Sequence, residues 1–398
     1  DVRLFEAAAD LGGRARTKSV DGFSLNQGPH ALYLGGAFKR ELDRLGIPYG
    51  GSRALGGTRQ AIWRGKLHDL PVSAGSLAMT RLFRIREKLA FARVFKAVTE
   101  GATGEGSFAH WLEVQKLPPV VRASLEALGR LSGYTNGSEH VSAAAILDQI
   151  RLALVGTLYL DGGWSSVVEG LAHAAREAGV EINTGVRVER LRVGGRQSRL
   201  VMADGAEAVA DATILALGPH EAAMLAPTIG SLALEAHEAM PVRANALDLA
   251  LSRMPDGAHD FALGVDEPFY LSLHSRSAKL APAGGAVVHV AKYLPVGEMP
   301  ARDAIAELEA VADLVMPGWR AFEVRRQELR GMIVSNGLPR WDRARPDVAL
   351  ADAPGVFIAG DWVGREGMIA DAAAASAVEA AREAASWLSG KASERSAA

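Results

Sequence analysis

The chain has 398 residues, of which 48% are hydrophobic and 23% are charged, so it is long enough for two or three globular domains with a large core. Its formal net charge of −2 excludes a global positive field of the kind that attracts nucleic acid. The sequence contains no cysteine, which excludes disulfides, thiol redox chemistry and cofactors attached through cysteine, and no apolar run reaches the about 18 residues that a membrane-spanning helix needs.

The first residues are typical of a dinucleotide-binding unit from its second strand onward. A short apolar strand is expected over Val2–Phe5, and it ends at Glu6. In a βαβ unit an acidic side chain at this point accepts hydrogen bonds from the adenosine ribose, roughly 20 residues after a Gly-x-Gly-x-x-Gly turn. Only five residues precede Glu6, so we expect that turn, with the first strand and helix, to lie upstream of residue 1. An ordinary edge strand before a glycine-rich turn is the alternative.

Helices dominate the predicted elements between residues 37 and 158. We expect a helix over Ala37–Leu45 that ends at Gly46, a small hairpin over Trp63–Leu67, and a helix rich in helix formers over Ala143–Leu154.

Residues 80–96 form a basic stretch with a helical pattern. Its predicted buried stripe consists of Leu82, Phe83, Leu89 and Phe95, beside the charged side chains. The pattern favours a substrate-domain helix with a solvated basic face. A helix that lies on a membrane surface, where a lipophilic substrate could enter, is the alternative.

Strands and helices alternate from residue 165 onward. A helix is expected over Ser165–Ala178, capped by Gly179, and strands are expected over Glu181–Thr184, Arg187–Val193, Arg199–Met202, Ala212–Leu217, Ala244–Ala250, Phe269–Leu273 and Ala286–Ala291. Asp303 is predicted to cap an amphipathic helix that carries four apolar residues on one side, Ile305, Leu308, Val311 and Val315.

The last predicted strand, Val356–Ala359, stops at Gly360-Asp361. A glycine-studded loop follows it, and then a helix of small residues. The free backbone N–H groups at the N-terminus of such a helix attract an anion or a carbonyl oxygen. Asp361, at the strand end, is placed to hold a sugar-alcohol hydroxyl.

Four blocks follow one another in a characteristic order: Glu6 with Gly12-Gly13-Arg14, Asn26–Tyr33, Asp161–Val188 and Gly360-Asp361. In this order they resemble the FAD-dependent oxidoreductases that include phytoene desaturases, protoporphyrinogen oxidases and flavin amine oxidases. The bacterial phytoene-dehydrogenase-like branch is the most similar. The blocks span most of the chain and are specific for the superfamily, but much less specific for a substrate.

The resemblance implies FAD as the cofactor and assigns its contacts. Glu6 would bind the adenosine ribose, and the backbone of Val186 the adenine. The turn Gly12-Gly13-Arg14 would wrap the pyrophosphate and approach the flavin, with Arg14 and Arg16 supplying positive charge.

The remaining contacts lie around the flavin. Residues 28–30 would pass the isoalloxazine ring, Asp361 would lie near the ribityl–pyrophosphate stretch, and Met368 and Ile369 near the pyrimidine edge. The full set of predicted cofactor-binding residues is Glu6, Gly12, Gly13, Arg14, Arg16, Gly28, Pro29, His30, Val186, Gly360, Asp361, Met368 and Ile369.

The predicted fold class is α/β. A Rossmann-like FAD-binding domain, whose first strand and helix are missing, is interleaved with a substrate domain of mixed sheet and helices. The FAD-binding domain would take residues 1–60, 159–222 and 336–388, and the substrate domain residues 61–158 and 223–335, with a disordered tail over 389–398.

The predicted function is dehydrogenation or desaturation of a lipophilic, isoprenoid or carotenoid-like substrate, with hydride transfer to flavin N5. The ending Gly367-Met368-Ile369-Ala370-Asp371 resembles desaturases, whereas amine oxidases usually carry an aromatic pair that faces the flavin and a Gly-Tyr-Met-Glu-Gly-like run near the C-terminus. His30 is the candidate catalytic residue, and a structural histidine is its alternative. Lys292 could imitate the flavin-side lysine of amine oxidases, although a surface lysine at a strand end is favoured.

Other classes stay open. A flavin amine oxidase and a protoporphyrinogen-oxidase-like enzyme are alternatives, and so is a non-catalytic lipid-binding module like the Rab GDP-dissociation inhibitors. No metal-ligand cluster, hydrolase motif or Walker loop competes with these interpretations. We expect a small lipophilic substrate, no nucleic-acid partner and a cytoplasmic location, with peripheral membrane contact through residues 80–96 left open.

Overall fold

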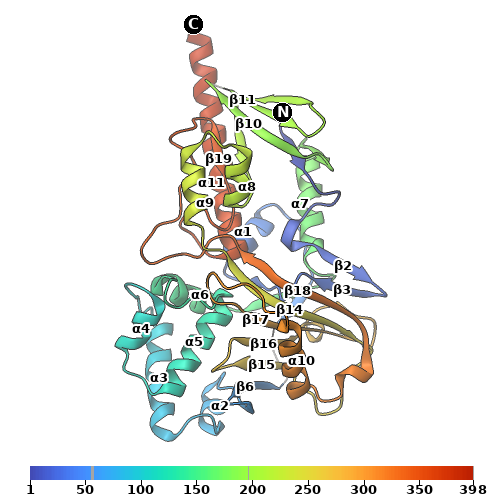
Figure 1. The fold of residues 1–398 in the computed structure, drawn as a ribbon, viewed down its shortest axis with the longest axis vertical. Helices are drawn as coiled ribbons and strands as arrows, with labels where there is room; N and C mark the ends of the chain where they lie inside the picture. Colours follow the sequence, from blue (N-terminus) through green and yellow to red (C-terminus); the bar gives the residue numbers. More distant parts are fainter. Residues whose placement is uncertain (55–57, 196, 398) are drawn as a thin grey trace.

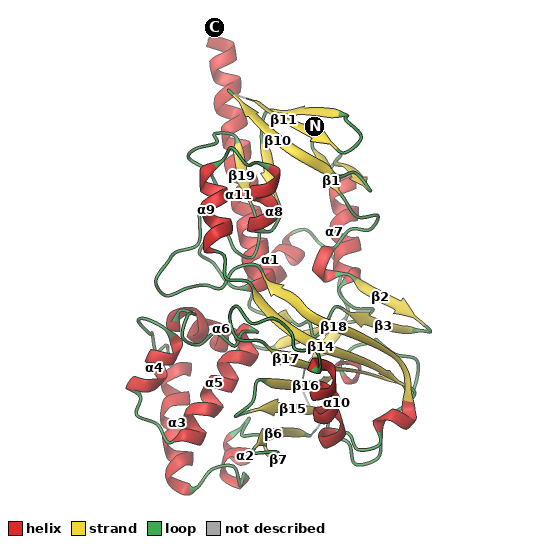
Figure 2. Cartoon of the chain, in the orientation of Figure 1, coloured by secondary structure: helices red, strands yellow, loops and turns green. Residues whose placement is uncertain are grey.

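The computed structural model describes residues 1–54, 58–195 and 197–397. Both termini lie at one end of the molecule, and helices α2 (Ala74–Met79) and α3 (Ile85–Thr99) lie at the other (Figure 1). The fold mixes sheets with helices that cover them, so the predicted α/β class is confirmed (Figure 2).

Two short pairs of parallel strands lie near the termini. Strand β1 (Arg3–Glu6) pairs with β9 (Glu181–Thr184), and β13 (Thr213–Leu215) pairs with β19 (Val356–Ile358). Within the described residues neither β1 nor β13 has a second strand partner, so each leaves one edge open. The expectation that a further strand and helix precede residue 1 stays a prediction.

Helices and a small antiparallel sheet surround these two pairs. The helices are α1 (Ala37–Arg44), α7 (Ser165–Glu177), α8 (Pro219–Leu225), α9 (Gly230–Glu238) and α11 (Ile369–Ala397). The sheet consists of β10 (Val188–Gly194), β11 (Gln197–Met202) and β12 (Glu207–Ala210). Helix α11 runs through the centre of this half of the molecule (Figure 1).

A seven-stranded sheet forms the floor of the second half. Its order is β18 (Glu323–Ser335), β14 (Val242–Leu251), β17 (Ala286–Tyr293), β16 (Phe269–Leu273), β15 (Phe261–Gly264), β6 (Arg59–Trp63) and β7 (Lys66–Asp69). All neighbours are antiparallel except the parallel pair β15–β6.

Helix α10 (Ala304–Val315) packs on this sheet through the four apolar residues predicted for it, and all four are buried. Asp303 occupies the N-cap position, as predicted, but its side chain makes no capping hydrogen bond. Burial of the apolar face therefore holds this helix in place rather than its cap.

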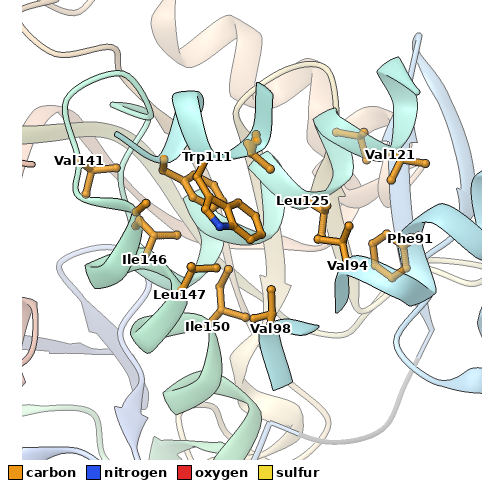
Figure 3. Close-up of a cluster of buried hydrophobic side chains, with 14 of the residues drawn as sticks. Phe91, Val94, Val98, Trp111, Val121, Leu125, Val141, Ile146, Leu147 and Ile150 are labelled. Carbon is orange, nitrogen blue, oxygen red and sulfur yellow. The ribbon is translucent and has the colours of Figure 1, made fainter. Parts of the chain in front are cut away.

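A group of helices stands beside the sheet and has its own apolar core. It comprises α2, α3, α4 (Phe108–Val114), α5 (Pro119–Gly133) and α6 (Ala143–Val155). Side chains from four of these helices meet in this core, among them Phe91, Val94, Val98, Leu125 and Ile146 (Figure 3).

The remaining strands are short and connect the two halves. They are β2 (Thr17–Val20), β3 (Phe23–Asn26), β4 (Leu32–Tyr33), β5 (Gly51–Arg53) and β8 (Thr157–Leu160). Strand β8 lies between β4 and β5, and both pairings are antiparallel.

One prediction is wrong. The helix expected from residue 80 begins at Ile85, so its buried face carries Phe91, Val94 and Val98, and Leu89 is 66% exposed instead of part of a buried stripe. Helix α11 extends as far as Ala397 in the described chain, and the disorder expected over residues 389–398 stays a prediction.

Helix α1 is capped by a side chain from α11. Asp371 accepts a hydrogen bond of 2.8 Å from the backbone N–H of Phe38, at the positive end of α1, and the approach is so close that Gly36 leaves no room for a Cβ. Burial nevertheless raises the pKa of the Asp371 carboxyl to about 6, while Arg40 favours and Glu366 opposes its ionisation.

Replacement of Ile146 by Ala should destabilise the helical group. Ile146 is fully buried in the core of Figure 3, so the loss of its methyl groups leaves a cavity and should cost about 2–5 kcal/mol of unfolding free energy. Urea denaturation followed by circular dichroism measures the change. Leu154→Ala on the same helix is the control, because Leu154 is half exposed. Equal losses for the two variants would contradict the assigned core.

Replacement of Asp371 by Asn should remove a pH dependence of stability. The folded pKa of about 6 exceeds the unfolded value of about 4, so the folded state binds more protons between these pH values and stability falls as pH rises through them. The unfolding free energy of Asp371→Asn should therefore exceed that of the parent by up to about 3 kcal/mol above pH 6, and the two should be equal near pH 4. Thermal melts across this range measure it, with exposed Asp148→Asn as control. If the melting temperatures of the parent and of Asp371→Asn changed with pH in parallel, the raised pKa of Asp371 would be ruled out.

Candidate cofactor and active site

A large cavity runs between the strand pairs, helices α7 and α11, and the seven-stranded sheet. Its volume is about 1410 Å³. Both strand pairs border the cavity. Leu4 of β1 and Ala216, which follows β13, line it together with small residues of α11. The cavity is thus bounded by segments from both ends of the chain.

The glycine turn near the N-terminus opens onto this cavity. Gly12 lines it and has a φ of +109°, a left-handed conformation that favours glycine, and a Cβ there would meet Val168 at 3.1 Å. The short 3₁₀ helix η1 (Gly13–Ala15) follows. Within the described residues the N–H groups of Gly13 and Arg14 donate no hydrogen bond. Successive free N–H groups of this kind form an anion-binding nest.

Arg14 joins this turn to the end of β19. Its Nη2 lies 2.8 Å from Oδ2 of Asp361, and its Nη1 donates to the carbonyl of Val334 at 2.7 Å. Asp361 is 2% exposed and also accepts hydrogen bonds from the backbone and side-chain amides of Asn336. Two residues predicted to hold the cofactor therefore pair with each other at the cavity wall.

The N-terminus of α11 points its free backbone groups to the same wall. Met368 and Ile369 line the cavity, and Ile369 has a φ of +55°, which is strained for a β-branched residue. The first hydrogen bonds of the helix are donated by Asp371 and Ala372. The N–H groups of residues 369 and 370 therefore stay available in the described chain, at the positive end of the helix dipole.

Glu6 and Val186 lie side by side without lining the cavity. The carbonyl of Glu6 accepts a hydrogen bond from the N–H of Val186 at 3.0 Å, and its carboxylate accepts one from the N–H of Ala8 at 2.7 Å. The structure thus brings together the two residues assigned to adenosine, at the carboxyl ends of the paired strands β1 and β9.

Of the thirteen predicted cofactor residues, seven line the cavity: Gly12, Arg14, Pro29, His30, Asp361, Met368 and Ile369. Gly13, Gly28 and Gly360 are chain neighbours of lining residues. Arg16 turns back on its own loop, with Nε 3.2 Å from the carbonyl of Gly13. The contacts of all thirteen with FAD stay predictions.

A buried carboxylate holds the turn that carries His30. Asp248 of β14 accepts hydrogen bonds from the N–H of Gly28 at 3.1 Å and from Gln327 at 2.9 Å, and its other oxygen lies 2.6 Å from Nδ1 of His289. Asp248 and His289 are fully buried and occupy paired positions of β14 and β17. The sequence-based prediction did not include this pair, although the sequence carries one signal for it, an acidic residue within the otherwise apolar run 246–251.

His30 lines the cavity as a neutral imidazole. Its Nδ1 donates to the carbonyl of Gly28 at 3.1 Å, and its ring packs against Trp164. Burial lowers the pKa of His30, and the nearby His289 lowers it further, so Nε2 keeps a lone pair at neutral pH. This geometry allows His30 to accept a proton or a hydrogen bond at Nε2.

The far end of the cavity lies above the seven-stranded sheet and is mainly apolar. It is lined by Ala244, Ala291, Tyr293, Met332 and Tyr134. Burial raises the pKa of both tyrosines, so their hydroxyls stay protonated. The hydroxyl of Tyr293 has no hydrogen-bond partner in the described chain.

Lys292 points away from this cavity. Successive residues of a strand face opposite sides, so Tyr293 faces the cavity while Lys292 faces α10, where its Nζ lies 2.7 Å from Glu307. Its ammonium also lies over the ring of Phe269. The interpretation of Lys292 as a residue beside the flavin therefore does not fit its position.

The donors around the cavity fit a dinucleotide cofactor of the size of FAD. Free N–H groups at Gly13-Arg14 suit a pyrophosphate, and those at the start of α11 suit a carbonyl oxygen. The buried indole N–H of Trp164, another lining residue, also lacks a partner within the described residues. Among the same residues, no group of three or more His, Cys, Asp or Glu side chains could hold a metal ion. None of the described helices has the length and apolar character to cross a membrane.

Solved structures of an oxidoreductase and of proteins described as oxidases have the same overall fold. An oxidoreductase from Methanosarcina mazei superposes with a TM-score of 0.74 at 18% identity, over 96% of this chain and 94% of that one. A protein described as a protoporphyrinogen oxidase from Exiguobacterium sp. 255-15 gives 0.71 at 16% identity, over 98% and 93%. The cyclohexylamine oxidase of Brevibacterium oxydans IH-35A gives 0.66 at 15%, over 96% and 93%.

No curated protein sequence matches this chain. The family described as flavin containing amine oxidoreductase matches residues 1–246, which is more than half of the chain and includes the glycine turn, the His30 segment and both strands of the adenosine side. The predicted superfamily, the FAD cofactor and the assignment as an oxidoreductase are therefore confirmed, and the chain belongs to the flavin-containing amine oxidoreductase family.

Proposed function

We propose that this FAD-dependent oxidoreductase dehydrogenates an electrically neutral, lipophilic substrate of isoprenoid or carotenoid type. The observation that carries the proposal is the far end of the cavity, where Ala244, Ala291 and Met332 offer apolar surface and no carboxylate is present among the described lining residues of that end. A cationic amine would lose its hydration there without gaining a counter-ion, so its transfer from water would be unfavourable. Burial of a hydrocarbon chain in the same place is favourable, because apolar surface is removed from water.

The protein's own residues bind, orient and shield the reactants. Arg14 and Asp361 fix the wall where the glycine turn meets β19, and the Asp248 carboxylate fixes the turn that presents His30. FAD, when bound, would supply the two-electron acceptor for a dehydrogenation that leaves a C=C bond in the substrate, and Nε2 of His30, which keeps a lone pair, would accept the proton. Tyr293 offers one hydroxyl to orient a polar group on an otherwise apolar substrate.

Anaerobic reduction of the FAD-loaded protein tests the proposal. A polyisoprenoid hydrocarbon presented in detergent micelles should bleach the visible flavin absorbance, whereas putrescine and cyclohexylamine should not. Bleaching by the amines alone would favour an amine oxidase, and bleaching by protoporphyrinogen alone would favour an enzyme of that class. Stable flavin that none of these compounds reduces would favour a lipid-binding module.

Replacement of Asp361 by Asn should weaken FAD binding. The change removes the charge that orders Arg14 and replaces one of the two acceptor oxygens of Asp361 by an NH2 donor, so the dissociation constant should rise about 10- to 100-fold. Flavin fluorescence titration measures it. Asp256→Asn, on an exposed turn that does not line the cavity, is the control. An unchanged dissociation constant for Asp361→Asn would show that Asp361 has no part in holding the cofactor.

A further inference from the structure

The outward face of α3 exposes large apolar side chains at its first turns. Ile85 is 72% exposed and Leu89 is 66% exposed, and they lie one helical turn apart on the same face. Met79, the last residue of α2, is 78% exposed, and Lys88 of α3 donates to the carbonyl of Ala78, which ties the two helices together at this point. The opposite face of α3 fills the core of the helical group (Figure 3).

Basic side chains surround these three residues. Residues 72–96 contain six Lys or Arg and one Glu, a local charge of +5 in a chain whose net charge is −2. Arg81, Arg84 and Arg86 are exposed and form no ion pair within the described residues, while the carboxylate of Glu87 accepts the backbone N–H of Arg84. We call Met79, Arg81, Arg84, Ile85, Arg86 and Leu89 the α2–α3 surface.

Apolar and basic groups so close together suit the interface of a bilayer with anionic headgroups. Met79, Ile85 and Leu89 would leave water for the acyl boundary, and the arginines would meet lipid phosphates, to which guanidinium groups donate paired hydrogen bonds. An aqueous acidic partner would satisfy the charges but would leave the apolar side chains in water. We propose that the α2–α3 surface docks the protein on a membrane with anionic headgroups.

The position of this surface makes it accessible to a membrane. The junction of α2 and α3 lies at the end of the molecule opposite to both termini (Figure 1). None of its six residues lines the cavity. Docking therefore requires no particular substrate, and its test does not depend on the test of the proposed function.

Co-sedimentation with vesicles tests the proposal. The full 398-residue protein should sediment with vesicles of phosphatidylcholine and phosphatidylglycerol at low salt, and should partition at least about tenfold less onto vesicles of phosphatidylcholine alone. Binding should weaken when salt is raised to about 1 M, where the Debye length falls to about 3 Å. No binding to the anionic vesicles, or equal binding to both kinds, would overturn the proposal.

Two triple variants and two matched controls locate the surface. Removal of the apolar groups (Met79→Ser, Ile85→Ser and Leu89→Ser) and removal of the charges (Arg81→Gln, Arg84→Gln and Arg86→Gln) should each lower partitioning about tenfold or more. The controls remove the same numbers of exposed apolar groups (Met224→Ser, Leu234→Ser and Met299→Ser) and exposed charges (Arg187→Gln, Arg190→Gln and Arg192→Gln) elsewhere, and should bind like the parent.

Folding and self-association are read in the same samples. Unchanged circular dichroism melts show that a variant is folded, as expected for exposed positions. Equal loss of binding in the controls would overturn the proposal. Sedimentation velocity gives the last outcome: a dimer in the parent that dissociates in the apolar variant would show that a second copy of the chain, and not a membrane, covers this surface.

Discussion

The placement of the site depends on one buried carboxylate. Asp248 lies fully buried on β14, the second strand of the seven-stranded sheet, where a carboxyl group without partners would be costly, and it is satisfied by Gly28, Gln327 and His289. Because one of these partners is the backbone N–H of the turn before His30, the requirement to satisfy the charge also fixes that turn to the sheet. The loop that borders the cavity is thereby tied to strand β14.

A second link joins the two ends of the chain across the cavity. The pair Arg14–Asp361 connects residues that are far apart in sequence, and the buried Asp371 connects α11 to α1 in the same region. The cavity wall is therefore built before any ligand contributes contacts, and within the described residues the N–H groups of Gly13 and Ile369 donate no hydrogen bond. Such preorganised donors do not have to be ordered when a ligand binds.

The sequence predicted the local elements and the contributors to the site better than the long-range pairings. The strands at 181–184 and 269–273 and a helix over 165–178, observed over 165–177, were predicted because their periodicity and flanking glycines are local signals. Strand β18 was missed, since its charged residues give it the pattern of a polar loop, and the parallel pairing of β6 with β15 leaves no local trace. Leu89 was assigned to the core because the start of α3 was placed five residues too early.

The open edges of β1 and β13 have a consequence for how this polypeptide behaves in concentrated solution. Within the described residues each has no strand partner on one edge, β1 carries the exposed apolar residue Leu4 and β13 carries Ile214, and neither strand contains a proline or a bulge that would prevent addition of a strand from another molecule. Any extended apolar segment can complete such an edge by β-augmentation. The solubility of this chain therefore depends on what covers the open edges of β1 and β13.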